Sequence, residues 1–154
     1  MPDDHPVFAA LERLEGAYAA ATIRAYRADN RTYLGHCAAG GWTPYPASAE
    51  TLEGFIEALG VDHAYVSVSR AVVAIHLGHQ LLDAPSPCKS QPVVLALRRL
   101  ARSRGRAQRQ ALGMTHDLRA RLMAATEAGL RGDRDRALLR LAYESMRRRA
   151  ELTS

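Results

Sequence analysis

The segment AATIRAYRADNRTYLGHCAA, residues 20–39, carries the pattern that decides the fold. Its apolar and aromatic residues recur at spacings of three and four, which places them on one side of an α-helix. That side is formed by Ile23, Tyr26, Asn30, Tyr33, Leu34 and Cys37. Arg24, Arg27 and Arg31 fall together on another side. The stretch therefore predicts a long helix with one buried face and one cationic face.

The segments around it show the same helical periodicity. Further helices are predicted over residues 6–18, 48–60, 65–82, 92–102 and 116–126, and from Asp133 onward. Glycine and proline punctuate the boundaries, as in the segment from Gly40 to Pro46 and in the run that follows Leu82. No segment alternates persuasively as a strand would, so the sequence predicts an all-α protein.

Individual residues predict where these helices begin and which face is buried. Pro6 can start the first helix, and Ser48 and Thr115 are suitable N-caps for two others. Asp133 is expected to open the last helix. The first helix would bury Phe8, Leu11, Leu14 and Tyr18. The helix over 92–102 would bury Val94, Leu95, Leu97 and Leu100.

The charge of the chain is unevenly distributed. The net charge is +5 over 154 residues, yet residues 1–20 carry −3 and residues 106–154 carry +5. Lys89 is the only lysine among 21 cationic residues. A GC-rich genome would produce such an arginine bias without any functional reason. A basic second half is nevertheless typical of proteins that bind phosphates, although an acidic protein partner would also be attracted.

Several other classes of function receive no support from the sequence. The first residues are acidic and unlike a signal peptide, and no apolar run approaches a membrane span, so a cytoplasmic, nucleoid-associated protein is expected. Cys37 and Cys88 are predicted to be reduced and structural. His76 and His79 have no third metal ligand nearby in the sequence. Hydrolase and phosphate-loop motifs are missing, and we expect neither a metal nor a small-molecule cofactor.

Three groups of residues are candidates for contact with a polyanion. The first is the row Arg24, Arg27 and Arg31, and the second is Ser67, Ser69 and Arg70 near a helix start. The third is the acid-free run of Arg98, Arg99, Arg102, Arg104, Arg106 and Arg109. Arginine offers bidentate geometry to phosphate, but rows of arginine are also common on solvated helix faces. The third group favours DNA or another polyanion, but charge by itself does not identify DNA as the partner.

Two separated parts of the chain resemble the tyrosine recombinase, or phage integrase, family, most closely its Cre-like branch. The segments 22–37 and 66–79 resemble the second and fourth helices of the family's core-binding domain. Residues 112–118, LGMTHDL, resemble the opening of its catalytic domain, and residues 133–152 resemble the helix that carries its first catalytic arginine. The resemblance covers about residues 20–152.

The resemblance implies a domain organisation and functional residues. Residues 1–104 would form a SAM-like helical bundle, 105–113 a basic linker and 114–154 the truncated start of the catalytic domain. Arg148 would be the first catalytic arginine and Glu151 its supporting acid, with Arg147 and Arg149 as alternatives. The DNA-facing set would include Arg24, Arg27, Arg31, Ser67, Ser69, Arg70, Arg98, Arg99, Arg102, Arg106 and Arg109.

The family joins DNA strands through a tyrosine nucleophile, and its implied function is DNA integration and recombination. The six tyrosines here fall where the family has no nucleophile, so the 154 residues are expected to bind DNA without cleaving it. The alternative is a helical interaction module that associates with an intact recombinase protomer. A third reading is a plain helical bundle. DNA binding that weakens steeply with added salt would favour the DNA-binding recombinase segment over the interaction module and the plain bundle.

Overall fold

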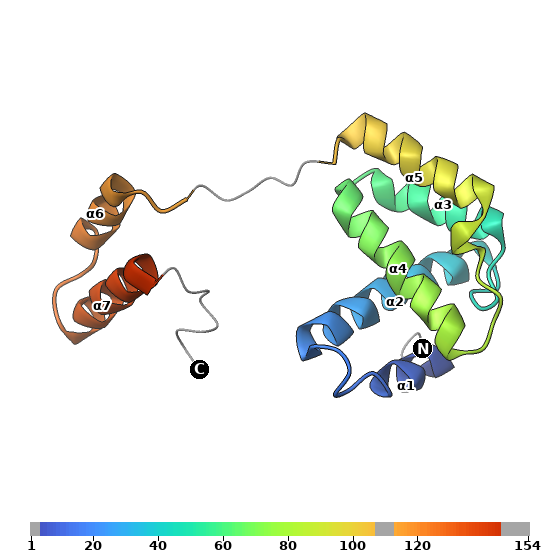
Figure 1. Cartoon of the computed structure of the whole chain (residues 1–154), viewed down its shortest axis with the longest axis horizontal. Helices are drawn as coiled ribbons and strands as arrows, with labels where there is room; N and C mark the ends of the chain where they lie inside the picture. Colours follow the sequence, from blue (N-terminus) through green and yellow to red (C-terminus); the bar gives the residue numbers. More distant parts are fainter. Residues whose placement is uncertain (1–3, 107–112, 146–154) are drawn as a thin grey trace. The chain divides into compact units, whose positions relative to one another are not determined.

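The computed structural model describes residues 4–106 and 113–145. The chain forms two compact units, Met1–Gln108 and Arg109–Ser154. The first unit contains α1 (Pro6–Glu12), α2 (Ala20–Gly40), α3 (Ala49–Gly60), α4 (Tyr65–Leu81), the 3₁₀ helix η2 (Pro87–Lys89) and α5 (Gln91–Arg104). The second contains α6 (His116–Ala124) and α7 (Leu130–Ser145) (Figure 1). The all-α prediction is confirmed, since the described residues contain a single isolated bridge, Glu15–Tyr18, and no strand.

The first unit is held together by two pairs of helices. Helix α2 crosses α4, and α3 packs along α5 (Figure 1). The buried faces of α2 to α5 meet in one core, which contains Tyr33, Cys37, Leu52, Phe55, Ile56, Val68, Val72, Ile75 and Val93. A second apolar cluster joins α1 to α2 through Val7, Phe8, Leu11, Leu14 and Leu34. Both thiols are buried and free, in agreement with their predicted structural role.

Side chains cap the helices as the sequence predicts. The Ser48 hydroxyl accepts the Thr51 N–H at 3.1 Å, and the Thr115 hydroxyl accepts the Leu118 N–H at 3.2 Å. Each bond satisfies a backbone donor that a helix start leaves unpaired. Helix α2 ends at Gly41, which has the left-handed conformation that favours glycine (φ +66).

Each of two predicted helix faces contains one residue that was wrong, while their other apolar residues are buried or partly buried. The first helix ends at Glu12, because the chain turns through Gly16 (φ +81), and Tyr18 lies 43% exposed instead of packing inside. In α5 the most buried residues are Val93 and Ala96, whereas Leu95 is exposed. The buried face of α5 is thus centred on Val93 and Ala96, and the predicted Leu97 and Leu100 pack against its edge.

The start of the last helix was also predicted too late. Helix α7 begins at Leu130, and the Asp133 N–H already donates to the Gly129 carbonyl at 2.9 Å. This earlier turn needs Gly132, because a β-carbon there would lie 1.7 Å from the Glu127 carbonyl oxygen. Asp133 is thus inside the first turn and pairs with Arg136 at 2.7 Å.

Helices α6 and α7 contact each other through a polar cluster. The Arg119 guanidinium lies 4.5 Å from the centre of the Tyr143 ring and pairs with Glu144 at 3.1 Å. Large apolar side chains on the same two helices stay in contact with solvent: Leu122, Leu130, Leu138 and Leu141. No helix in the described part of the chain is long and apolar enough to cross a membrane.

Candidate nucleic-acid interface

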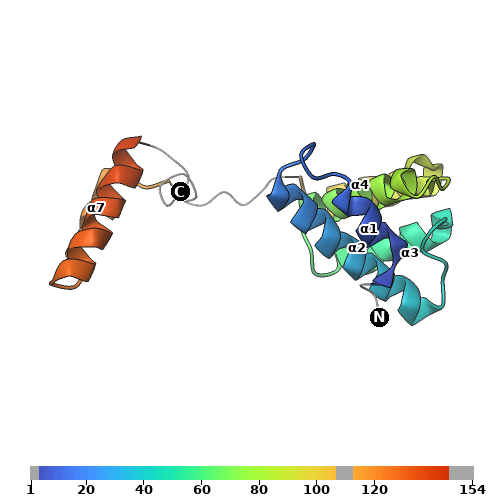
Figure 2. The ribbon, with the colours of Figure 1, turned by 90° about the horizontal axis from the view of Figure 1, so that it is seen from below.

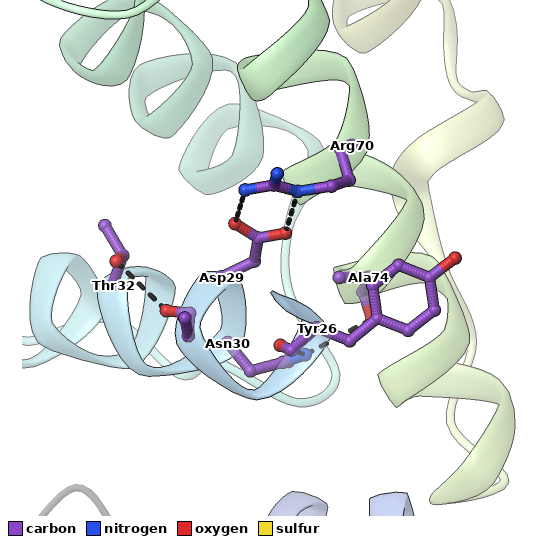
Figure 3. A network of polar contacts seen from close by, with 7 residues as sticks. Tyr26, Asp29, Asn30, Thr32, Arg70 and Ala74 are labelled. Carbon is purple, nitrogen blue, oxygen red and sulfur yellow. Dashed lines mark hydrogen bonds and ion pairs between the residues drawn. The ribbon is translucent and has the colours of Figure 1, made fainter. Parts of the chain in front are cut away.

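A bidentate ion pair joins α2 to α4 where the two helices cross. Arg70 donates from Nε to Asp29 Oδ2 at 2.8 Å and from Nη2 to Oδ1 at 2.9 Å. Figure 3 shows the guanidinium and the carboxylate facing each other edge to edge. The Asp29 side chain is 10% exposed, but that of Arg70 is 50% exposed. The pair therefore has a buried acceptor and a donor that solvent can reach.

The same crossing contains a second, buried polar contact. Asn30, fully buried, donates to the Tyr26 carbonyl at 2.9 Å and reaches the Ala74 carbonyl of α4 at 3.4 Å (Figure 3). Its Oδ1 accepts the Tyr45 hydroxyl. Asp29 and Asn30 thus connect α2 to α4 on adjacent faces, which fixes the orientation of the two helices.

The hydrogen bonds that Asp29 accepts have an electrostatic consequence for Arg70. They are the largest cause that raises the pKa of Arg70 above its ordinary value. The guanidinium therefore stays protonated at any physiological pH. The sequence does not predict a partner for Arg70, and the ion pair with Asp29 gives its half-exposed side chain a fixed position.

The arginine row on α2 does not form one uniform stripe. Arg27 pairs with Glu12 at 3.0 Å and lies 5.8 Å from the centre of the Phe8 ring. Arg31 also lies over Phe8, at 5.9 Å. Arg24 has no hydrogen bond or ion pair with the rest of the described chain and borders a hollow of about 380 Å³ beside Tyr18. Of the three, Arg24 is the most available to an external anion.

The serines near the start of α4 are half-buried. Ser67 and Ser69 precede Arg70 on α4. The larger exposed side chains on this helix are Val66 and Val73, which stand four residues before and three residues after Arg70. These spacings place Val66, Arg70 and Val73 on one outward face.

The arginines of α5 gather around one hollow. The hollow has a volume of about 600 Å³ and is lined by Leu95, Arg98, Arg99, Ala101, Arg102 and Arg106. Arg99 pairs with Glu53 at 2.5 Å and with Glu57 at 3.2 Å, so α3 compensates part of a run that contains no acid in the sequence. Arg104 donates to the Val61 carbonyl, and Arg106 lies 5.7 Å from the centre of the Tyr65 ring. Arg98 and Arg102 have no ion-pair partner among residues 4–106 and 113–145.

These groups share one end of the first unit. Figures 1 and 2 place the N-terminal end of α2, the N-terminal end of α4 and the C-terminal end of α5 on the same side. Arg24 belongs to the first turns of α2 and Arg102 to the last turn of α5, whereas Arg70 lies where α2 and α4 cross. We call this surface, defined by Arg24, Ser67, Ser69, Arg70, Arg98 and Arg102, the cationic end.

The remaining predicted site residues lie outside the described part of the chain. They are Arg109, Arg148 and Glu151, together with Arg147 and Arg149.

The two histidines of α4 have structural partners instead of metal-like surroundings. His79, fully buried, donates from Nδ1 to the Ile75 carbonyl at 2.8 Å, and its Nε2 accepts the Ala47 N–H at 3.1 Å. His76 forms a hydrogen bond with the Ser86 hydroxyl at 2.8 Å. Within the described ranges, no three histidine, cysteine or acidic side chains come together to hold a metal ion.

A helical bundle with arginines exposed at one end is typical of proteins that bind nucleic acid. No protein-family model matches the sequence. The chain is similar to a protein named integrase/recombinase xerD homolog from Selenomonas ruminantium, with 35% identity over 149 residues. The match covers 93% of this chain and 43% of that protein, so the chain spans less than half the length of the relative. The similarity supports a relationship to the tyrosine recombinase family.

Sequence reasoning missed the acidic partners of the cationic groups. Asp29 looked like a minor partner for its own helix, but it binds Arg70, 41 residues away. Glu53 and Glu57 were assigned no role, and they hold Arg99. The spacing of Glu53 and Glu57 by one helical turn was the available signal, since residues at i and i+4 share a face.

Proposed function

We propose that this chain is a DNA-binding segment of a tyrosine recombinase, with the cationic end as its contact surface for double-stranded DNA. The similarity to the integrase/recombinase xerD homolog supports the class. The observation that carries the assignment to DNA is that Arg24, Arg98 and Arg102 border surface hollows and have no acidic partner in the described chain. Unpaired guanidinium groups are the donors that duplex phosphates attract.

The proposal includes the family's core-binding architecture, most similar to the Cre-like branch. Residues 1–104 would then be the DNA-binding bundle and residues 105–113 the basic linker. Residues 114–154 would begin the catalytic domain, and Arg148 and Glu151 would take part in its active site. Other recombinase protomers are the expected protein partners. The cytoplasmic, nucleoid-associated location follows from this function as a prediction.

Electrostatic binding of this kind has a characteristic salt dependence. Each phosphate neutralised by an arginine releases condensed counterions, so the logarithm of the affinity falls linearly with the logarithm of salt concentration, with a slope of about −0.9 per contact. Three unpaired arginines at the cationic end therefore predict a slope steeper than about −2.

Fluorescence anisotropy with a labelled 30-base-pair duplex at several salt concentrations tests the proposal. The Arg24→Ala/Arg102→Ala double variant should bind less tightly and show a salt slope reduced by about 2. Lys89→Ala is a matched control, because it removes an exposed cation from η2, at the opposite end of α5. If the folded chain fails to bind duplex DNA at low salt, or if Lys89→Ala weakens binding as much as the double variant, the proposal is wrong.

A further inference from the structure

The Asp29–Arg70 pair has a geometry that leaves one particular edge of the guanidinium exposed. Arginine has five N–H donors, and Asp29 occupies one on Nε and one on Nη2. Three donors stay available, on Nη1 and the outer side of Nη2. They form the end-on fork of the guanidinium, which points away from the buried carboxylate (Figure 3).

The pair is poorly suited to neutralising phosphate. Its two charges cancel, and a carboxylate within hydrogen-bond distance opposes the approach of another anion. Arg24, Arg98 and Arg102 differ in this respect, because no carboxylate partners them in the described residues. Arg70 is thus the arginine of the cationic end whose position is fixed and whose charge is compensated.

The neighbours of Arg70 on the outward face of α4 are apolar or small. Val66 is 37% exposed and Val73 is 51% exposed. Ser69 stands beside Arg70 in the sequence, and its short side chain allows close approach to the helix. This face therefore presents one oriented arginine, exposed methyl groups and a small hydroxyl. Such groups are suited to the edges of DNA bases, because arginine binds guanine and apolar groups contact the thymine methyl.

We propose that Arg70 reads a guanine in the major groove of duplex DNA and that Asp29 is a positioning residue that holds its fork for this contact. The inference rests on the proposed DNA-binding function. The Nη1 and Nη2 donors would bind guanine O6 and N7, which is a bidentate contact with the same geometry as the exposed fork. Asp29 occupies the opposite edge, so the side chain meets the base in one orientation.

Selection from a library of duplexes with a randomised centre tests this inference on the full chain. The unmodified chain should enrich guanine at one position, with a preference of about 5- to 140-fold over other bases. Arg70→Lys keeps the charge and loses the fork, so the preference should disappear. Asp29→Asn should also reduce the preference while affinity for the bulk library stays equal or rises, because the variant gains one net positive charge.

Arg24→Ala is the matched control. It should weaken binding to all library members equally and leave the base preference intact. A second readout needs no variant: replacing the selected guanine by 7-deazaguanine removes the N7 acceptor and should lower the affinity of the unmodified chain about 5-fold or more. This measurement keeps the inference testable if Asp29→Asn fails to fold.

The outcomes separate the two proposals. If the unmodified chain does not bind duplex DNA at all, the proposed function itself is wrong. If it binds without base preference, or if the preference survives in Arg70→Lys, the DNA-binding function stands and the base-reading role of Arg70 is wrong. A purely structural Asp29–Arg70 pair predicts altered stability with unchanged base preference, which would equally overturn the inference.

Discussion

The backbone N–H of Ala47 donates to Nε2 of His79 at 3.1 Å, which attaches the loop before α3 to the buried side of the last turn of α4. Nδ1 of the same ring donates to the Ile75 carbonyl at 2.8 Å. The imidazole therefore has one nitrogen as donor and the other as acceptor, which only its neutral form allows. The ring also lies 4.6 Å from that of Tyr45. His79 thus connects α4 to the loop that contains Tyr45 and Ala47, through one protonation state.

This arrangement predicts that stability falls in mild acid. Burial is the main cause that lowers the pKa of His79 below its ordinary value, and the charge of nearby His76 acts in the same direction. Below about pH 6.5 the unfolded chain therefore binds more protons than the folded chain. The free energy of unfolding is highest above that pH and declines as the pH falls below it. Burial lowers the pKa of His5 and of His36 as well, and they add to the decline.

Urea denaturation at a series of pH values between 5 and 8 measures this effect. His79→Gln should be less stable than the unmodified chain at neutral pH but should show a smaller loss between pH 7 and pH 5. An unchanged pH slope in that variant would show that the titration of His79 does not contribute.

The two partners of the Asp29–Arg70 pair should have unequal effects on stability. Arg70→Ala leaves the buried carboxylate of Asp29 without its partner. An unpaired buried charge lowers the free energy of unfolding by up to about 3–5 kcal/mol. The loss should be smaller here, because solvent can enter the space left by the arginine side chain. Asp29→Ala leaves a half-exposed guanidinium that water can hydrate, so a cost of about 1 kcal/mol is expected. Chemical denaturation of both variants measures the difference. Equal costs, or a larger cost for Asp29→Ala, would contradict the assigned burial.

Two glycines in helices should respond in opposite directions to alanine. A β-carbon at Gly78 would lie 2.7 Å from the Tyr45 hydroxyl oxygen, and Tyr45 is packed between Tyr33 and His79. Gly78→Ala is therefore expected to destabilise the bundle by about 1–3 kcal/mol. Gly35 in α2 has nothing within 4 Å of its added β-carbon, so Gly35→Ala should stabilise by about 0.5–1 kcal/mol. Thermal unfolding compares them directly, and a stabilising Gly78→Ala would mean that Tyr45 moves aside freely.

Helices α6 and α7 are predicted to self-associate or to be partly disordered over residues 113–145. Leu130 is 90% exposed, and Leu138 and Leu141 also face solvent in the described residues. Apolar surface of this kind is removed from water by contact with another molecule. Sedimentation velocity should show association that weakens in Leu138→Gln/Leu141→Gln. Slow amide exchange over residues 133–145 in a dilute monomer would contradict the prediction.

The 154 residues are predicted not to cleave DNA by themselves. Burial is the main cause that raises the pKa of the Tyr33 and Tyr45 hydroxyls, so neither is a ready nucleophile. Tyr65 and Tyr143 have their rings under Arg106 and Arg119. Incubation with a nicked suicide duplex, followed by denaturing electrophoresis, should give no covalent protein–DNA adduct. Detection of such an adduct would overturn the prediction.

The sequence by itself determined the helical class, most helix boundaries and the identity of the caps. Those features depend on residues within about one turn of each other: the spacing of Tyr33 and Cys37, the hydroxyls of Ser48 and Thr115, and Gly41 at the end of α2. Helical periodicity and capping hydrogen bonds depend on residues that are close together in the sequence, so they can be predicted without knowledge of the tertiary structure.

Only the tertiary structure decided which arginines are available. Arg27, Arg70 and Arg99 look alike in the sequence to Arg24, Arg98 and Arg102, but the first three meet Glu12, Asp29 and Glu53 from other helices. These pairings depend on how α2 crosses α4 and how α3 lies along α5, which short-range patterns do not encode. On α5, the exposure of Leu95 and the burial of Ala96 also depend on how the helices pack. When a helix lies between two other helices, the distance to each of them determines which of its side chains are buried.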